Sequence, residues 1–415
     1  MTGILGKQPI RSSGVVGAFA STGIDDNADA IAVTIDSDES VTLSGDLVPS
    51  APLSNRNIII NGAMTVAQRG NGASTLTGSA GYYHTADRMF NFDNCVPANF
   101  TRETTNGVLG TETGNTFNDV FPYSWKFASN GTVSPIPAGD RVIFIYKMEG
   151  QDVQHLAKGT ASAKPVTLSF WVKSTQTGNH QVNLVDNTNT RQIGAVYSIS
   201  SASTWEKKVI TFAGDTTGAL ANSNANALSI EWWLTAGANY TSGAVPTSWE
   251  ANAAGDRAVE QQNYVGGSGR TWQITGIQLE LGSNATPFEF RSYGDELARC
   301  QRYYQKFTGS SDATTMWNLT TSETARRIYF HQEMRDTPSG EVVGTVQNSS
   351  GASHTSTTWS IYHSASWRGC SALAINTLST TSARVDGTTH DSVTAGGASG
   401  LYGGADTALI FIAEL

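Results

Sequence analysis

Charged residues are scarce in this sequence. Asp, Glu, Lys and Arg make up 15% of its 415 residues, whereas an average soluble protein has roughly 25%. The balance is acidic, with a formal net charge of −9, and no basic stripe stands along the chain. Because nucleic-acid binding needs such a stripe to displace the counterions of the phosphates, we expect no nucleic-acid partner.

Cysteines and long apolar runs are also few. The three cysteines, Cys95, Cys300 and Cys370, lie far apart, form no CxxC or Cys/His pattern and leave an odd number for pairing. No apolar run reaches the ~18 residues of a membrane span, and the first residues lack an apolar stretch of signal-peptide length. We expect stability from burial and assembly, synthesis in a cytoplasm, and no membrane insertion.

Sequence motifs for catalysis are missing too. There is no GxSxG, no HExxH and no phosphate-binding glycine loop, and the seven histidines form no ligand pair of useful spacing. A glycosidase needs two carboxylates roughly 5–10 Å apart. No spacing brings together two of the acids nearest to expected strands, which are Glu206, Glu231, Glu280 and Glu289. We expect a protein that is not an enzyme and that binds no metal or cofactor.

Glycine, serine, threonine, asparagine and aromatic residues fill the sequence instead. It has 42 Gly, 10 Trp, 13 Tyr and 15 Phe, and the aromatics stand in short β-branched runs such as residues 166–172. Apolar and polar residues alternate with period two over 271–281, which predicts a strand with one buried face. We therefore predict an all-β chain of antiparallel β-sandwich or jelly-roll modules.

The first 55 residues differ from the rest, since no Lys or Arg stands between residues 12 and 55. Two short strands are expected, over 30–36 and 40–45, joined by an acidic turn. Two strands of this size cannot form a core of their own, so we interpret residues 1–55 as an arm that completes its burial against another chain. Its closely spaced aspartates, Asp25, Asp26 and Asp29, form no EF-hand-like loop and indicate a solvated turn.

Three further segments are predicted after the arm. Residues 56–293 form a large antiparallel module, 294–308 a connecting helix with acids at its start and basic residues toward its end, and 309–415 a smaller β-sandwich. The strands expected in the first module cover 57–63, 88–92, 124–127, 141–148, 165–174, 181–185, 207–212, 227–234 and 271–281. Those expected in the second cover 325–332, 341–347, 358–363, 371–376 and 408–413.

A series of motifs in this order resembles a module of fibre and appendage proteins of tailed bacteriophages. The resemblance covers roughly residues 57–304 and rests most on its two ends. The motifs are NIIINGAM at 57–64, QRG at 68–70, ADR at 86–88, VTLSFWVKS at 166–174, STWE at 203–206, ITGIQLELGSNATPFE at 274–289, RSYGDEL at 291–297 and CQRYY at 300–304.

The resemblance implies a carbohydrate-binding-module-like jelly roll in a homotrimeric virion fibre, followed by a tip domain. The arm would anchor the fibre to a phage tail, collar or capsid protein, and the tip would bind host-surface polysaccharide. Such a chain is assembled in the host cytoplasm and exposed on the particle exterior. The alternatives are a capsid- or collar-attached decoration protein and, less well supported because no parallel β-helix repeat occurs, a tailspike depolymerase.

Aromatic side chains are the candidate sugar contacts, because an exposed ring can stack on a sugar. Trp232 and Trp233 are neighbours on an expected strand, so their side chains leave opposite faces; core packing or a subunit contact is the competing interpretation. Residues 356–370 concentrate aromatic, His and Arg side chains of the kind found at binding hot spots. The competing interpretation is an aromatic strand pair in a trimer core. The predicted ligand-binding residues are Trp232, Trp249, Trp359, Tyr362, His363, Trp367 and Arg368.

Overall fold

The computed structural model describes residues 54–415, except 71–73, 77–79, 84, 96–99, 106–120, 130, 310–313 and 354, together with two strands nearer the start. The chain separates into two units, Met1–Ser50 and Ala51–Leu415. In the first unit, β1 (Val33–Ile35) pairs antiparallel with β2 (Val41–Leu43), as predicted. The aspartates of the arm lie outside the described residues.

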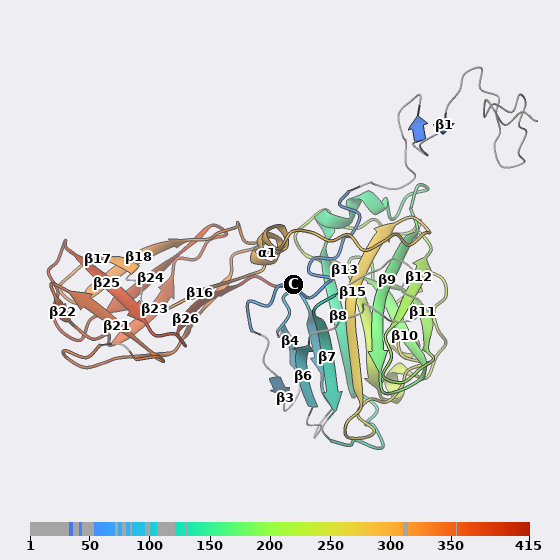
Figure 1. Cartoon of the computed structure of the whole chain (residues 1–415), viewed down its shortest axis with the longest axis horizontal. Coiled ribbons are helices and arrows are strands. Elements are labelled where there is room, and N and C mark those ends of the chain that lie inside the picture. Colours follow the sequence, from blue (N-terminus) through green and yellow to red (C-terminus); the bar gives the residue numbers. More distant parts are fainter. Residues whose placement is uncertain are drawn as a thin grey trace, which may run out of the picture. The chain divides into compact units, whose positions relative to one another are not determined.

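Two antiparallel sheets form the large module of the second unit (Figure 1). One has the strand order β14-β11-β10-β13-β8-β5-β4 and the other β12-β9-β15-β7-β6-β3. The seven strands of the first are β4 (Ala80–Tyr83), β5 (Phe90–Asp93), β8 (Arg141–Glu149), β10 (Gly178–Asp186), β11 (Arg191–Ile199), β13 (Asn226–Ala236) and β14 (Glu250–Ala251). The six of the second are β3 (Ser74–Leu76), β6 (Phe100–Thr105), β7 (Ser124–Ser129), β9 (Val166–Ser174), β12 (Glu206–Phe212) and β15 (Thr271–Leu281).

The chain passes repeatedly from one sheet to the other. From β7 onward it crosses to β8, back to β9, over to the β10–β11 hairpin, back to β12, over to β13 and finally to β15, with the two-residue strand β14 formed on the way. This connectivity is that of a two-sheet jelly-roll sandwich. The predicted all-β, antiparallel sandwich class is confirmed.

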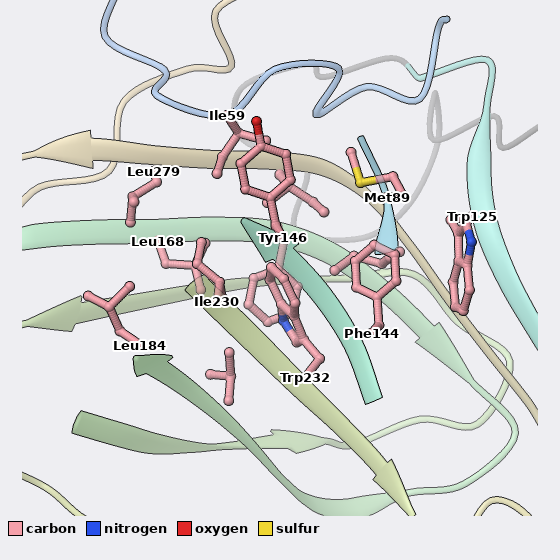
Figure 2. Packing of buried hydrophobic residues seen from close by; sticks show 14 of the residues in the cluster. Ile59, Met89, Trp125, Phe144, Tyr146, Leu168, Leu184, Ile230, Trp232 and Leu279 are labelled. Carbon is pink, nitrogen blue, oxygen red and sulfur yellow. The ribbon is translucent and has the colours of Figure 1, made fainter. Parts of the chain in front are cut away.

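The core of this sandwich lies between the two sheets. Figure 2 shows side chains from both meeting there, among them Leu168 and Leu279 from one sheet and Leu184 and Ile230 from the other. Aromatic rings fill the space beside them; the Phe144 and Trp232 ring centroids are 5.4 Å apart. Such large buried side chains dominate the stabilisation of a sandwich.

One predicted strand of the sandwich, over 57–63, is wrong. Asn61 and Met64 have positive φ angles of 61° and 57°, which interrupt an extended strand. The side chain of Asn57 holds the segment in place: its Oδ1 accepts from the Leu279 amide at 3.1 Å and its Nδ2 donates to the Ile277 carbonyl at 3.1 Å. Residues 57–64 therefore run beside β15 as an irregular segment.

The predicted helix is shorter than expected. α1 spans Tyr293–Gln301, begins at Ser292, whose Oγ accepts from the Asp295 amide at 3.1 Å, and buries Cys300. Residues predicted as its last turn form β16 (Tyr304–Thr308), which pairs with β26 (Ala408–Ile412). The smaller module thus begins at β16 and not at residue 309. Among the described residues, no helix is both long and apolar enough to cross a bilayer.

Two further sheets make up this smaller module, called the tip domain below. One has the order β16-β26-β19, and the other β20-β21-β25-β17-β18-β24-β23, with β22 pairing with β21. Only the β20–β21 pair is parallel. The remaining strands are β17 (Thr314–Asn318), β18 (Glu323–Tyr329), β19 (Ser339–Val343), β20 (Thr345–Val346), β21 (Thr358–His363), β22 (Ser366–Trp367), β23 (Ala372–Asn376), β24 (Ser382–Thr388) and β25 (Ala398–Gly403).

The last residues of the tip domain bond to the sandwich. Glu414 forms ion pairs with Arg69, at 3.0 Å, and with Arg88, whose side chain is 1% exposed. The guanidinium of Arg88 also donates to the Lys147 carbonyl at 2.8 Å and lies 3.4 Å from the ring centre of Tyr303. A carboxylate from one domain therefore neutralises two arginines of the other in a dry environment.

All three cysteines are free and buried. Burial raises the pKa of the Cys95 and Cys370 thiols to about 12. These thiols are therefore protonated at neutral pH and unreactive.

A buried histidine makes the sandwich sensitive to acid. His180 donates from Nδ1 to the Gly178 carbonyl at 3.0 Å, so Nε2 accepts from the Tyr264 hydroxyl at 2.7 Å, and its ring stacks on Tyr197. Burial lowers the pKa of His180 to about 4. The unfolded chain binds this proton near pH 6.5, so the stability contributed by neutral His180 is lost as the pH falls from 6.5 toward 4.

We expect the free energy of unfolding to drop by about 2.5 kcal/mol between pH 7 and about pH 4.5 because of this one group. Urea unfolding of the native chain and of His180→Gln at both pH values measures the difference. Groups common to both proteins cancel in the comparison, including Asp87, whose pKa burial raises to about 6 with the opposite effect on stability. An equal loss of stability in both proteins would show that His180 does not titrate in this way.

Candidate functional site

Aromatic side chains stand on one face of the large tip-domain sheet. In β17, Trp317 is 58% exposed while its neighbours Met316 and Asn318 are fully buried, because successive side chains of a strand point to opposite faces. In β25, Tyr402 is half-buried between the buried Leu401 and Gly403. Trp317 and Tyr402 therefore both point away from the core of the tip domain.

The strand register places five aromatic residues on this face. Trp317 pairs with Ala398 and Tyr362 with Gly400, two positions that share a face of β25 with Tyr402. Tyr362 also pairs with Trp367 of β22, and Trp317 with Ala325 of β18, which puts Tyr329, four residues further, on the same side. We call this surface the aromatic face; its residues are Trp317, Tyr329, Tyr362, Trp367 and Tyr402.

Three of these rings form a cluster, and two are more isolated. The ring centroids of Trp367 lie 5.0 Å from Tyr362 and 5.1 Å from Tyr402, in edge-to-face arrangements that fix the ring orientations. Tyr329 is the most exposed aromatic residue of the described chain, at 72%. The aromatic face crosses five neighbouring strands, β22 to β18, which is roughly 19 Å at about 4.8 Å per strand.

Small residues separate the rings. Ala398 and Gly400 of β25 and Ala325 of β18 occupy the positions paired with, or next to, Trp317 and Tyr362. Their side chains are at most one methyl group, so they do not extend far from the sheet. The rings therefore stand beside a shallow floor on which a flat ligand can lie.

Three of the residues predicted from the sequence as ligand contacts, Trp232, Trp359 and His363, are buried in the folded chain. Trp232 is 0% exposed in the core of the sandwich, and Trp233, on the other face of β13, is covered by Ala258 and Tyr240. His363 is a structural residue, since its Nδ1 donates to the Ala398 carbonyl at 2.9 Å and its Nε2 accepts from the Thr394 amide at 3.2 Å. Trp359 faces inward, and its indole donates to the Val343 carbonyl at 2.9 Å.

The other predicted residues are partly accessible, but the structure does not bring them all together. Tyr362 and Trp367 belong to the aromatic face, with Arg368 next in the chain and half-buried. Trp249 lies in the sandwich, where its indole donates to the Ala213 carbonyl at 2.7 Å and Lys158 stands 5.0 Å from its ring centre. Since Lys158 is held there by Asp186 and Asp215, one face of the Trp249 ring is covered.

The four carboxylates weighed as catalytic candidates each have local partners. Glu206 pairs with Lys208 at 2.6 Å, and Glu231 accepts from the Trp233 indole at 3.1 Å. Glu280 accepts from the Thr286 amide at 2.9 Å, and Glu289 accepts from the Asn57 amide at 2.9 Å. Desolvation raises the pKa of Glu289, but hydrogen bonds from the backbone of Asn57 and Arg56 and the positive charge of Arg291 outweigh it and hold this pKa below its usual range. Glu280 thus ties a loop to β15 and Glu289 joins two irregular segments, whereas these contacts of Glu206 and Glu231 lie within their own strands.

Trp317, Tyr329 and Tyr402 were missed by reasoning from the sequence. β17 and β25 are short, glycine- or threonine-rich strands that were not predicted, although the alternation Thr315-Met316-Trp317-Asn318 is a weak signal for one of them. Their convergence depends on strand order, which no local pattern encodes.

Comparisons with known proteins give limited likenesses. No protein-family model and no curated protein matches the chain. Among solved structures, the enzymatically active domain of tailspike protein 4 of bacteriophage CBA120 is 12% identical with a TM-score of 0.27; the match covers 54% of this chain and about a fifth (21%) of the tailspike chain.

Carbohydrate-binding modules are similar to the chain at the same low level. The family 11 module of Clostridium thermocellum, solved with a mixed-linked β-1,3-1,4 tetrasaccharide, is 14% identical with a TM-score of 0.26, over 52% of this chain and 99% of the module. The xylan-binding domain from Paenibacillus barcinonensis is 7% identical with a TM-score of 0.24, over 55% and 96%. TM-scores this low carry no argument about function, and the fold assignment rests on the sheets themselves.

Proposed function

We propose that this chain is a virion fibre protein of a tailed bacteriophage that attaches to host-surface polysaccharide through the aromatic face of its tip domain. The observation that carries the binding part is the row of five aromatic side chains on neighbouring strands. Trp and Tyr are the residue types enriched at binding hot spots, and here they stand on five neighbouring strands, with three of the rings in contact.

The chemistry of the aromatic face suits a carbohydrate. The C–H groups of a sugar ring form an apolar plane that stacks on an indole or phenol ring. Sugar hydroxyls at the edge of that plane can bond to the hydroxyls of Tyr329, Tyr362 and Tyr402. The low floor at Ala398 and Gly400 lets a polysaccharide strand lie along the sheet. Because the contacts are spread over five strands, several sugar units can be bound at once.

The virion part of the proposal rests on the sequence. The phage-fibre motifs run in order over roughly residues 57–304, and the low-charge, glycine- and aromatic-rich composition suits an exterior protein. Residues 1–55 would bind a tail, collar or capsid protein, and the chain would act as a homotrimer without enzymatic activity. Three weak sites per fibre give tight attachment, since each bound site raises the effective concentration of the others.

Trp317→Ala and Tyr329→Ala are expected to weaken binding to host cells, or to their purified polysaccharide, by at least about tenfold each. Losing one ring–sugar stack of this size corresponds to about 1.4 kcal/mol. Binding of the fluorescently labelled chain to cells and to a polysaccharide panel gives the measurement. Tyr293→Ala is the matched control, because Tyr293 is 61% exposed but belongs to α1.

Two results would contradict the proposal. If the control variant lost as much binding as the tip variants, the aromatic face would not be the contact. If Trp317→Ala changed the oligomeric state and left polysaccharide binding intact, the face would be a subunit interface. Imaging of the particle tests the mounting separately: residues 1–55 found on capsid protein would favour the decoration-protein alternative.

A further inference from the structure

A cavity of about 670 Å³, open to solvent on one side, lies in the tip domain next to the aromatic face. It has the volume of an ordinary ligand pocket. Trp359, Leu401 and Leu409, all nearly buried, line it together with Ile328, while Tyr329 of the aromatic face also contributes. Both sheets of the tip domain supply residues to it, so the cavity depends on how the sheets pack and not on one loop.

Positive charge surrounds this cavity. Lys306 of β16 and Arg326 and Arg327 of β18 line it, and among the described residues no Asp or Glu does. Within the described part of the chain, Lys306 and Arg326 have no ion pair, and Arg327 donates only to the Ser382 hydroxyl, at 3.0 Å. In a protein of net charge −9, three such cations around one hollow create a local positive potential that attracts anions. We call it the cationic cavity.

The strand edge at the cavity offers backbone groups as well. β18 pairs with β24 along its whole length, but with β17 only at Ala325 and Thr324. The four residues beyond, 326–329, all line the cavity. No described strand pairs with this edge at 326–329. Such an edge presents N–H and C=O groups in a row, which match sugar hydroxyls that donate and accept hydrogen bonds.

From these observations we infer that the cationic cavity binds an acidic saccharide, with the sugar carboxylate on Arg326 and Lys306. The guanidinium of Arg326 is suited to a carboxylate because its planar fork can donate two parallel hydrogen bonds. Arg326 lies on the same face of β18 as the buried Thr324 and Ile328, so its side chain leaves the strand toward the interior of the tip domain. The apolar lining at Trp359 and Leu401 would contact the sugar ring.

The inference is separate from the proposed function, because it names a second site and a defined chemical class. A neutral polysaccharide on the aromatic face would not need these cations. An acidic polysaccharide could contact both the aromatic face and the cationic cavity, since Tyr329 belongs to each.

Matched pairs of oligosaccharides test the inference: uronate- or sialate-bearing chains and the same chains with their carboxyl groups reduced to alcohols. We expect the full chain to bind at least one acidic member at least tenfold more tightly than its reduced counterpart in calorimetry. Raising the salt from 50 to 500 mM should weaken the acidic member only, because salt screens charge. Arg326→Gln and Lys306→Gln should each remove most of the preference.

Arg384→Gln is the matched control, since Arg384 lies on the neighbouring strand β24, pairs with Asp386 and does not line the cavity. Melting temperatures show whether each variant is folded. Lys306→Gln changes an exposed position, so it keeps the test valid if the Arg326 variant misfolds.

Equal affinity for acidic and reduced sugars, no binding of any acidic member, or an unchanged preference in both variants would overturn the inference. So would inorganic sulfate competing as well as the acidic sugar. Trp317→Ala should leave this preference intact, so failure of the aromatic face is seen separately.

Discussion

Glu414→Ala is expected to lower the free energy of unfolding by about 3–5 kcal/mol, the range for removing one partner of a buried ion pair. Arg88 is 1% exposed and Glu414 5%, so the guanidinium left behind cannot be solvated by water. Arg69 would lose its contact with Glu414 as well, keeping Asp87 at 3.3 Å. Chemical denaturation followed by tryptophan fluorescence measures the loss.

The matched control for Glu414 is an exposed ion pair. Asp386 pairs with Arg384 at 2.6 Å, but their side chains are 28% and 40% exposed. Asp386→Ala should therefore cost less than about 1 kcal/mol. The double variant Arg88→Met with Glu414→Met should recover part of the loss, because it leaves neither charge of that pair buried alone. Similar effects of Glu414→Ala and Asp386→Ala would show that the buried network adds no special stability.

Trp232→Ala is expected to cost about 3–5 kcal/mol, as is usual for truncating a large aromatic residue in a core. Trp232 is fully buried between the sheets, with Phe144 and Phe170 at ring-centroid distances of 5.4 and 5.6 Å. Its removal leaves a cavity that neighbouring rigid rings cannot fill. The measurement is the denaturant midpoint of the sandwich transition, since a chain with several domains need not unfold in one step.

Trp317→Ala gives the opposite pattern and so serves as the control. The same side chain is removed, but from an exposed position, where the stability change should stay within about 0.5 kcal/mol. We thus expect Trp232→Ala to unfold the sandwich early while the folded protein still binds, and Trp317→Ala to bind poorly while folding normally. A large loss of stability in Trp317→Ala would indicate that its ring packs against another protein surface, such as a second copy of this chain.

Much of the strand content could be predicted from the sequence. The period-two alternation and β-branched runs located β9, β13, β15 and β21 to within about two residues. Where prediction failed, side chains override the local pattern: the run at 57–63 has the composition of a strand, but Asn57 and Asn61 bond to other segments and turn the backbone. The helix was overextended for a similar reason, because Tyr304 begins a strand that only the distant residues 408–412 can complete.

The candidate site was harder to predict than the fold. Adjacent tryptophans look like a ligand platform, yet both faces of β13 are covered, so Trp232 and Trp233 are core residues. The aromatic face is assembled from residues 317 to 402, on strands whose order is not their order in the chain. Sequence patterns indicate which residues alternate, but the non-local register decides which of them share a face. Tyr362 and Trp367 were named from the sequence because they stand close together in it, and the local β21–β22 pair places them on one face.

The pairing of β16 with β26 means that the chain enters and leaves the tip domain at one point. Everything between residues 309 and 407 is an insertion on a single strand pair, with Glu414 and Leu415 closing onto the sandwich beyond it. A different domain that kept this strand pair, these last contacts and the hydrogen bonds between Arg335 and Asn224 could join the same sandwich. The tip domain could then be exchanged as one unit through recombination, while the sandwich stays the same.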